Sequence, residues 1–132
     1  MVFGTFDGLH KGHLDFFQQA KRLAKDSFLI VSIARAKNVA RIKGRKPNFP
    51  EKKRLTLVKK CKIVDRVVLA GKEKYLKHIL KEKPKIIALG YDQKAFVKDL
   101  RKDLRQKRIS IKIIRLKSYR KNIYKNHLLR NK

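Results

Sequence analysis

The chain has 132 residues, of which 38 are Lys or Arg and 10 are Asp or Glu, so its formal net charge is +28 at pH 7. This balance excludes an acidic disordered chain and makes anionic partners the expectation. Hydrophobic residues make up 42% of the chain, enough for one core at this length, and we expect a single domain over residues 1–132. The sequence has no run of 18 apolar residues and no secretory signal pattern, so we expect a soluble protein of the cytoplasm.

The beginning of the chain predicts a strand, a helix and a second strand. Residues 1–6 are mostly apolar or β-branched and stop at a turn-forming Asp-Gly pair, which is typical of a strand that feeds a loop. After Gly12, apolar and small residues recur at the spacing of one helix face, at Phe16, Phe17, Ala20, Leu23 and Ala24. Residues 28–33 form a continuous apolar run, as expected of a strand covered on both faces in a parallel sheet.

A basic segment follows over residues 35–48, which hold Lys and Arg but no acidic residue. Gly44 and Pro47 interrupt any regular pattern there, so we predict a loop. Pro50 suits the first turn of a helix that continues to Cys61, because the apolar residues between them share one face. Cys61 has no second cysteine with which to form a disulfide or a zinc site, and we expect a small buried side chain.

The second half of the chain continues the alternation of strands and helices. The predicted strands are residues 64–70, 86–89 and 109–116, and the predicted helices are residues 72–83 and 94–107. A tail from residue 119 carries spaced apolar side chains and predicts a last short helix. His78 lies among charged residues on its helix and His127 lies in the tail, so we expect both at the surface.

Five strands that alternate with helices predict an α/β fold, a doubly wound five-stranded parallel sheet with right-handed crossovers. In this architecture ligands bind beyond the carboxyl ends of the strands. We therefore expect three segments to meet at that edge: residues 4–13, 35–46 and 90–93.

The segment from Gly4 to His13 carries the chemistry. His10 and His13 stand three residues apart, with Gly12 between them, where a loop becomes a helix. Backbone N–H groups at a helix N-terminus attract phosphate, and Gly12 lets a phosphate approach the backbone closely. The two imidazoles can donate hydrogen bonds to oxygens whose negative charge rises during phosphoryl transfer. A zinc site is disfavoured, because zinc needs three or four ligands and no carboxylate or cysteine stands at a suitable spacing.

With these residues, the sequence resembles the cytidylyltransferase-like nucleotidyltransferase superfamily, whose signature Gly-X-Phe-Asp-X-X-His-X-Gly-His is matched in full by residues 4–13. The small archaeal-type FAD synthases are similar in residues 43–47, in Phe49-Pro50-Glu51 and Arg54-Leu55, and in residues 89–93. Glycerol-3-phosphate cytidylyltransferase, which uses CTP, shares the first motif but is less similar in the middle of the chain. The resemblance implies a Rossmann-like fold and transfer of a nucleotidyl group from a nucleoside triphosphate to a phosphate monoester, with release of pyrophosphate. ATP and FMN are the implied substrates, and Mg²⁺ would be carried mainly by the triphosphate.

The resemblance also implies roles for individual residues. The catalytic residues would be His10, His13 and Lys43. The nucleotide would be bound by Thr5, Phe6, His10, Gly12, His13, Gly90 and Asp92, and the second substrate by Lys37 and Lys46. Asp7 is expected to hydrogen-bond the loop and not to act as a base, since an acceptor phosphate is already ionised at neutral pH and needs alignment more than deprotonation.

Two positions depart from the family pattern. Relatives commonly open the last helix with a motif rich in hydroxyl groups, whereas this chain reads Tyr124-Lys125-Asn126-His127. The Arg-Asp-Lys string that often follows the second strand reads Arg35-Ala36-Lys37, without the acid. We expect either change to lower activity or to alter the nucleotide preference.

The basic surface leaves two other functions open. Residues 104–132 hold 11 cations and no acid, which would suit a nucleic-acid-binding protein whose affinity falls with salt. The low aromatic content of 8% and the lack of an RNA-recognition string argue against it. The altered tail motif would suit an inactive relative that only binds nucleotide. A homodimer is a further expectation, because small members of the superfamily often pair.

Overall fold

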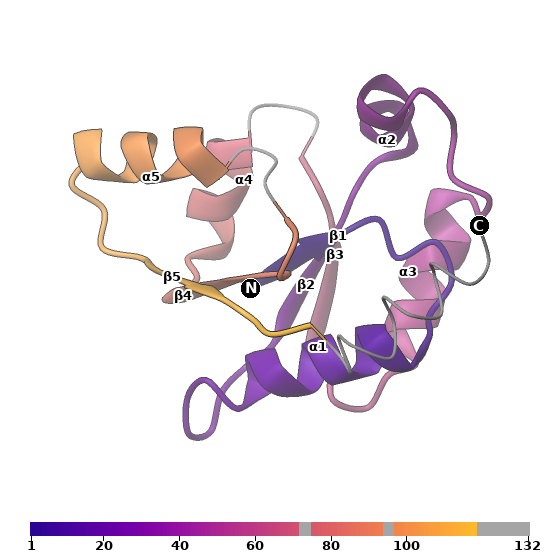
Figure 1. The fold of residues 1–132 in the computed structure, drawn as a ribbon, viewed down its shortest axis with the longest axis horizontal. Helices are drawn as coiled ribbons and strands as arrows, with labels where there is room; N and C mark the ends of the chain where they lie inside the picture. The colour runs from indigo at the N-terminus through magenta and orange to yellow at the C-terminus, as the bar shows by residue number, and fades with distance from the viewer. Residues whose placement is uncertain (72–74, 94–96, 119–132) are drawn as a thin grey trace.

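The computed structural model describes residues 1–71, 75–93 and 97–118 (Figure 1). Within these residues the strands are β1 (Val2–Gly4), β2 (Ile30–Ile33), β3 (Arg66–Leu69), β4 (Ile86–Leu89) and β5 (Lys112–Arg115). The helices are α1 (Lys11–Lys21), α2 (Ala36–Lys43), α3 (Glu51–Lys59), α4 (Tyr75–Glu82) and α5 (Val97–Gln106). The expected α/β class is confirmed. The tail motif that contains Asn126 and His127 lies outside the described residues.

The strands form two parallel sheets and not the single five-stranded sheet predicted. One sheet has the order β1-β2-β3, and the other pairs β4 with β5. The two sheets meet at Met1, whose amine donates to the Ile86 carbonyl at 2.9 Å and whose carbonyl accepts from the Ala88 N–H at 3.0 Å. Because β1 is only three residues long and leaves the sheet after Gly4, this contact does not extend into a ladder along β4.

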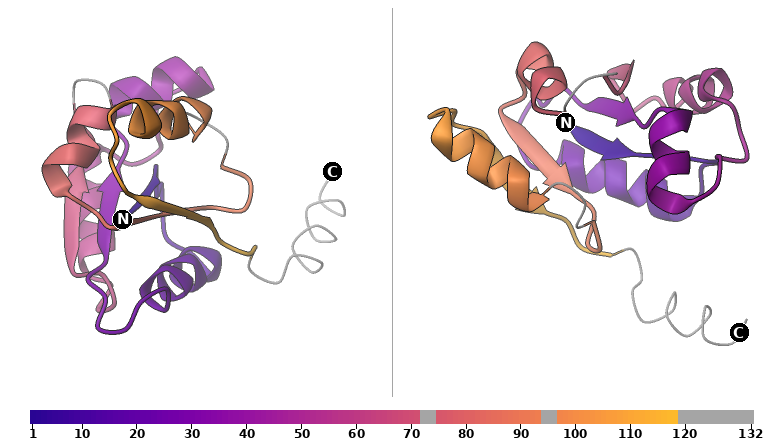
Figure 2. Two further views of the ribbon diagram at one scale, coloured as in Figure 1. Left: turned by 90° about the vertical axis from the view of Figure 1, so that its left-hand side faces the viewer. Right: turned by 90° about the horizontal axis from the view of Figure 1, so that it is seen from above.

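Helices cover both faces of the strands (Figures 1 and 2). On one face, Phe17 of α1 and Val58 of α3 belong to a buried cluster with Val31 of β2. On the other face, Leu100 of α5 packs in a second buried cluster with Ile87 of β4. Both clusters come from continuous apolar strands, as a sheet with two covered faces requires. Pairing is parallel within each sheet, and the bonds of Met1 to Ile86 and Ala88 have the pattern of a parallel pair, so the carboxyl ends of all five strands face the same edge.

The basic segment that was predicted as a loop contains helix α2, so this prediction was wrong. Gly44 does end the helix, because its φ of 76° lets it adopt the left-handed conformation of a helix C-terminus. The start of the helix depends on a residue far along the chain: the Ala36 N–H donates to Glu51 Oε1 at 2.7 Å. A remote carboxylate thus supplies the cap that the local sequence lacks.

His78 lies against the sheet, so the expected surface position was wrong. Its Nε2 atom is 2.8 Å from the hydroxyl of Ser32, which is buried in the middle of β2. Burial lowers the pKa of His78 from its ordinary value. The charges of Lys81 and Arg35 lower it further, whereas the charge of Glu82 raises it. Its charged sequence neighbours hid this position, because α4 directs His78 and the buried Ile79 toward the strands.

Candidate active site

The loop between β1 and α1 has an unusual backbone that depends on Gly4. Phe6 has a φ of 51°, and such a left-handed non-glycine residue typically costs about 1–3 kcal/mol and persists only where its surroundings hold it. The buried Phe6 ring folds back over Gly4, where a Cβ atom would lie 2.7 Å from Phe6 Cζ. The predicted strand over residues 1–6 is therefore shorter than expected, since Thr5 and Phe6 turn away from the sheet.

The side chains of His10 and His13 together cap the N-terminus of α1. His10 is the residue before the helix, and its Nδ1 accepts a hydrogen bond from the Gly12 N–H at 3.0 Å. In return, Nδ1 of His13 accepts from the His10 N–H at 3.3 Å, and the ring centroids are 3.9 Å apart. Because each Nδ1 is an acceptor, the neutral rings carry their proton on Nε2. Both rings are therefore N–H donors.

This pairing changes how an anion would be held. The sequence suggested unpaired backbone N–H groups at the helix N-terminus, but the N–H groups of Gly12 and His13 already donate to His10. Hydrogen bonding to a phosphate would therefore fall to the imidazoles, while the helix dipole still favours negative charge there.

His13 is neutral at pH 7 in the folded chain. Burial, with a smaller contribution from the charge of His10, lowers the pKa of His13 to about 4. The Phe6 ring packs edge-on against it, with the ring centroids 5.4 Å apart. A neutral His13 at pH 7 donates only through Nε2, which agrees with the tautomer set by the His10 N–H.

We expect the folded chain to lose stability as the pH falls from 6.5 toward 4. Over this range an unfolded His13, with the ordinary pKa of 6.5, binds a proton that the folded residue does not bind until about pH 4. The His13→Asn variant should lack this part of the pH dependence. An NMR titration of the His13 ring measures the pKa directly, and a midpoint near 6.5 would contradict the burial argument.

Asp7 anchors the segment that follows α2. Its carboxylate accepts hydrogen bonds from the backbone N–H groups of Asn48 at 2.6 Å and Phe49 at 2.7 Å. The Asn48 bond is the main reason that the pKa of Asp7 is lowered, and Phe49, Arg54 and Lys43 lower it further. The carboxylate is thus ionised and occupied, as the expected structural role requires.

Lys43 connects α2 to the loop between β1 and α1. It lies in the last turn of α2, and its Nζ donates to the Thr5 hydroxyl at 3.3 Å. The structure therefore brings Lys43 to the loop that carries the histidines. Lys37 and Lys46 are exposed, one in the first turn of α2 and the other between Gly44 and the Asp7 anchor.

The segment after β4 is held by a residue that sequence reasoning missed. Nη1 of Arg115, at the end of β5, donates to the carbonyls of Gly90 and Gln93, both at 2.8 Å. Gln93 closes the turn by accepting from the Gly90 N–H at 3.2 Å, and Asp92 is exposed on the turn. The only signal for Arg115 was a cation at the end of a predicted strand, which many cations in this chain share.

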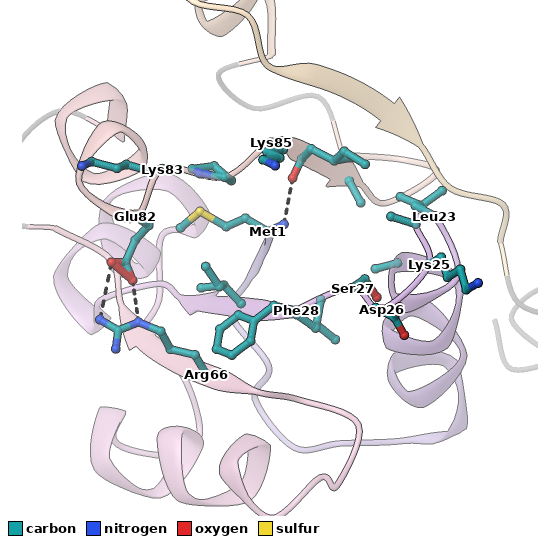
Figure 3. Close-up of a pocket in the computed structure, with 17 residues that line it drawn as sticks. Met1, Leu23, Lys25, Asp26, Ser27, Phe28, Arg66, Glu82, Lys83 and Lys85 are labelled. Carbon is teal, nitrogen blue, oxygen red and sulfur yellow. Dashed lines mark hydrogen bonds and ion pairs between the residues drawn. The ribbon is translucent and has the colours of Figure 1, made fainter.

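A separate cavity of about 660 Å³ lies at the opposite edge of the strands (Figure 3). Met1, Leu23 and Phe28 line it, together with the ion pair in which Arg66 Nε is 2.9 Å from a Glu82 oxygen. None of the candidate site residues lines this cavity. Since open α/β sheets bind ligands at the carboxyl ends of their strands, the candidate active site is the edge that carries His10 and His13.

The described residues contain neither a cluster of metal ligands nor a helix that could cross a membrane. No group of three or more His, Cys, Asp or Glu side chains is arranged to hold a metal ion in this part of the chain. Among the same residues, no helix is both long and apolar enough to span a membrane.

Comparison with known proteins decides the family. A family model described as cytidylyltransferase-like matches residues 1–131. The chain belongs to the cytidylyltransferase-like family. This confirms the resemblance to that family.

Several archaeal proteins with curated names are similar to this chain. It is 44% identical to the FAD synthase of Korarchaeum cryptofilum, over 88% of this chain and 79% of the relative. It is 43% identical to the FAD synthase of Methanothermus fervidus, over 92% and 84% of the two chains. The solved structure of a lipopolysaccharide core biosynthesis protein from Thermoplasma volcanium superposes with a TM-score of 0.81 at 38% identity, covering 90% of this chain and 95% of that one.

Proposed function

We propose that this chain transfers AMP from ATP to FMN, forming FAD and pyrophosphate. The observation that carries the acceptor is the similarity to curated archaeal FAD synthases, at 36–44% identity over 87–100% of this chain. The geometry supports the reaction type, because two imidazole rings and Lys43 lie around one loop at the carboxyl edge.

In the proposed reaction, a phosphate oxygen of FMN attacks the α-phosphorus of ATP, and the bond from that phosphorus to the bridging oxygen of the β-phosphate breaks. His10 and His13 would donate through Nε2 to the α- and β-phosphate oxygens as their charge grows. Lys43 would neutralise charge on the acceptor phosphate or on the leaving pyrophosphate. No residue needs to remove a proton from the acceptor, which agrees with the occupied carboxylate of Asp7.

The remaining parts of the site follow the same proposal. Thr5, Phe6 and Gly12 would border the nucleotide through the backbone, and Gly90 and Asp92 would contact its ribose and base. The exposed ammonium groups of Lys37 and Lys46 would attract the second substrate. These assignments stay predictions.

Mg²⁺ would enter the site bound to the triphosphate of ATP. Both Asp7 oxygens already accept backbone hydrogen bonds, and Mg²⁺ commonly relies on substrate phosphates and water with only one or two protein carboxylates. The donor set of the described residues fits this mode of binding. The ion would supply positive charge to the phosphate oxygens, in addition to that of Lys43.

The test is a panel of two nucleotides and two acceptors. The purified chain with MgCl₂ receives ATP or CTP together with FMN or glycerol 3-phosphate, and pyrophosphate release and product formation are measured by chromatography. We expect turnover with ATP and FMN only, and loss of turnover when EDTA removes the metal. Turnover with CTP and glycerol 3-phosphate would support the cytidylyltransferase alternative instead.

Two other outcomes address the remaining alternatives. No turnover with any pair, together with salt-sensitive binding to RNA or DNA, would overturn the enzyme proposal. Nucleotide binding without turnover would indicate an inactive relative. The expected homodimer and cytoplasmic location stay predictions, to be tested by light scattering and by cell fractionation.

A further inference from the structure

Arg54 of α3 is a buried cation that the proposed mechanism does not use. The residue has no exposed surface, and its guanidinium donates to three backbone carbonyls. Nη1 donates to Thr5 at 3.0 Å and to Ala34 at 2.7 Å, while Nε donates to Phe49 at 3.0 Å. One side chain thus ties together the residues that follow β1, the residues that follow β2 and the segment that Asp7 anchors.

Burying the Arg54 guanidinium costs free energy that packing by itself does not explain. Nη2 of Arg54 is buried with no hydrogen-bond partner among the described residues. Burial lowers the pKa of the guanidinium, and the charges of Glu51 and Asp7 offset this only in part. A buried cation with an unsatisfied donor is less stable than an apolar side chain of similar size would be. Filling space in the core therefore does not account for an arginine at position 54.

The contacts lead from Arg54 to His13. Arg54 holds the Thr5 carbonyl, and so it sets the orientation of the peptide plane between Thr5 and Phe6. Phe6 has its left-handed backbone directly after this peptide, and that conformation aims its ring at His13. Lys43 holds the hydroxyl of the same Thr5 from the other side.

We propose that Arg54 is a positioning residue, which holds the Thr5–Phe6 peptide so that the Phe6 ring orients and buries His13 for nucleotidyl transfer. The kinetic part of this inference rests on the proposed function. The structural part, the state of the His13 ring, can be tested whether or not the chain turns over ATP and FMN.

The experiment compares Arg54→Met and Arg54→Lys with Lys52→Met, an exposed position on the same helix. NMR titration of the His13 ring and steady-state kinetics are measured for each folded variant. In Arg54→Met we expect the His13 pKa to rise from about 4 toward the ordinary 6.5, because a displaced Phe6 ring buries the imidazole less. We also expect kcat to fall about 10- to 100-fold with a smaller change in KM for ATP.

Arg54→Lys keeps the charge but offers one donor atom instead of a fork, so partial recovery of both readouts is expected. Lys52→Met should match the wild-type chain. A folded Arg54→Met variant with an unchanged His13 pKa and unchanged kcat would overturn the proposal, since a purely structural arginine would change stability alone.

A second variant covers the case in which no Arg54 variant folds. Phe6→Leu keeps Arg54 but removes the ring that contacts His13, and it should raise the His13 pKa and lower kcat in the same way. A wild-type His13 pKa in Phe6→Leu would overturn the proposed route. If the wild-type chain shows no turnover, the proposed function fails, yet the NMR comparison still decides whether Arg54 controls His13.

Discussion

His13→Ala is expected to lower kcat for FAD formation by about 10²–10³-fold, the effect typical of removing one hydrogen-bond donor to a transition-state oxyanion. In the proposed reaction the His13 ring would donate from a half-buried position beside Phe6, where little water competes for the developing charge. The hydrogen bond that its Nδ1 accepts from the His10 N–H holds the ring in place before substrate binds. Circular dichroism and steady-state kinetics with ATP and FMN measure the result.

Two variants of His10 distinguish its proposed role as a hydrogen-bond donor to phosphate from its role as the helix cap. His10→Ala would remove both, and loss of an N-cap typically costs about 0.5–2 kcal/mol of stability. His10→Asn keeps a side-chain acceptor for the Gly12 N–H, so it should retain stability while losing most activity. The exposed Gln18 on the same helix provides the control, as Gln18→Ala should change neither quantity. Wild-type turnover in both histidine variants would refute their proposed role.

Gly4→Ala is expected to destabilise the fold by about 1–3 kcal/mol, the usual cost of inserting an atom into a packed core. The new Cβ would lie 2.7 and 2.8 Å from Cζ and Cε2 of Phe6. The Phe6 ring has no space in which to retreat, because it is buried and also packs against Phe17, with the ring centroids 5.3 Å apart. We expect activity to fall as well, since a shifted Phe6 ring would release His13. Urea unfolding measures the free energy, and the same samples are assayed for turnover.

Gly44→Ala is the matched control for this substitution. Gly44 has a φ of 76°, but a Cβ there would meet no atom within 4 Å. Alanine at this position should cost about 1 kcal/mol through its backbone alone and should leave the Phe6 ring undisturbed. An unchanged free energy of unfolding in Gly4→Ala would show that the contact with Phe6 is unimportant.

Local patterns in the sequence were sufficient for most of the secondary structure. The apolar runs at residues 28–33 and 86–89 correspond to β2 and β4, because a strand covered on both faces must be apolar throughout. The same local reasoning missed α2, since its first N–H is capped by Glu51, fifteen residues from Ala36. The same reasoning predicted a single sheet, because the pattern of a short strand does not reveal how many of its backbone groups hydrogen-bond to the neighbouring strand.

The sequence likewise indicated some properties of the candidate site, and the tertiary structure decided the others. The spacing of His10, Gly12 and His13 by itself indicated phosphate chemistry at a helix N-terminus, because the residue types and the turn between them are local properties. Only the tertiary structure decided the surroundings of those groups: how far burial lowers the pKa of His13, and that Arg54 reaches the loop. Each of these depends on atoms brought together from distant parts of the chain, and hydrogen-bond partners and burial are properties of such contacts, which residue spacing does not encode.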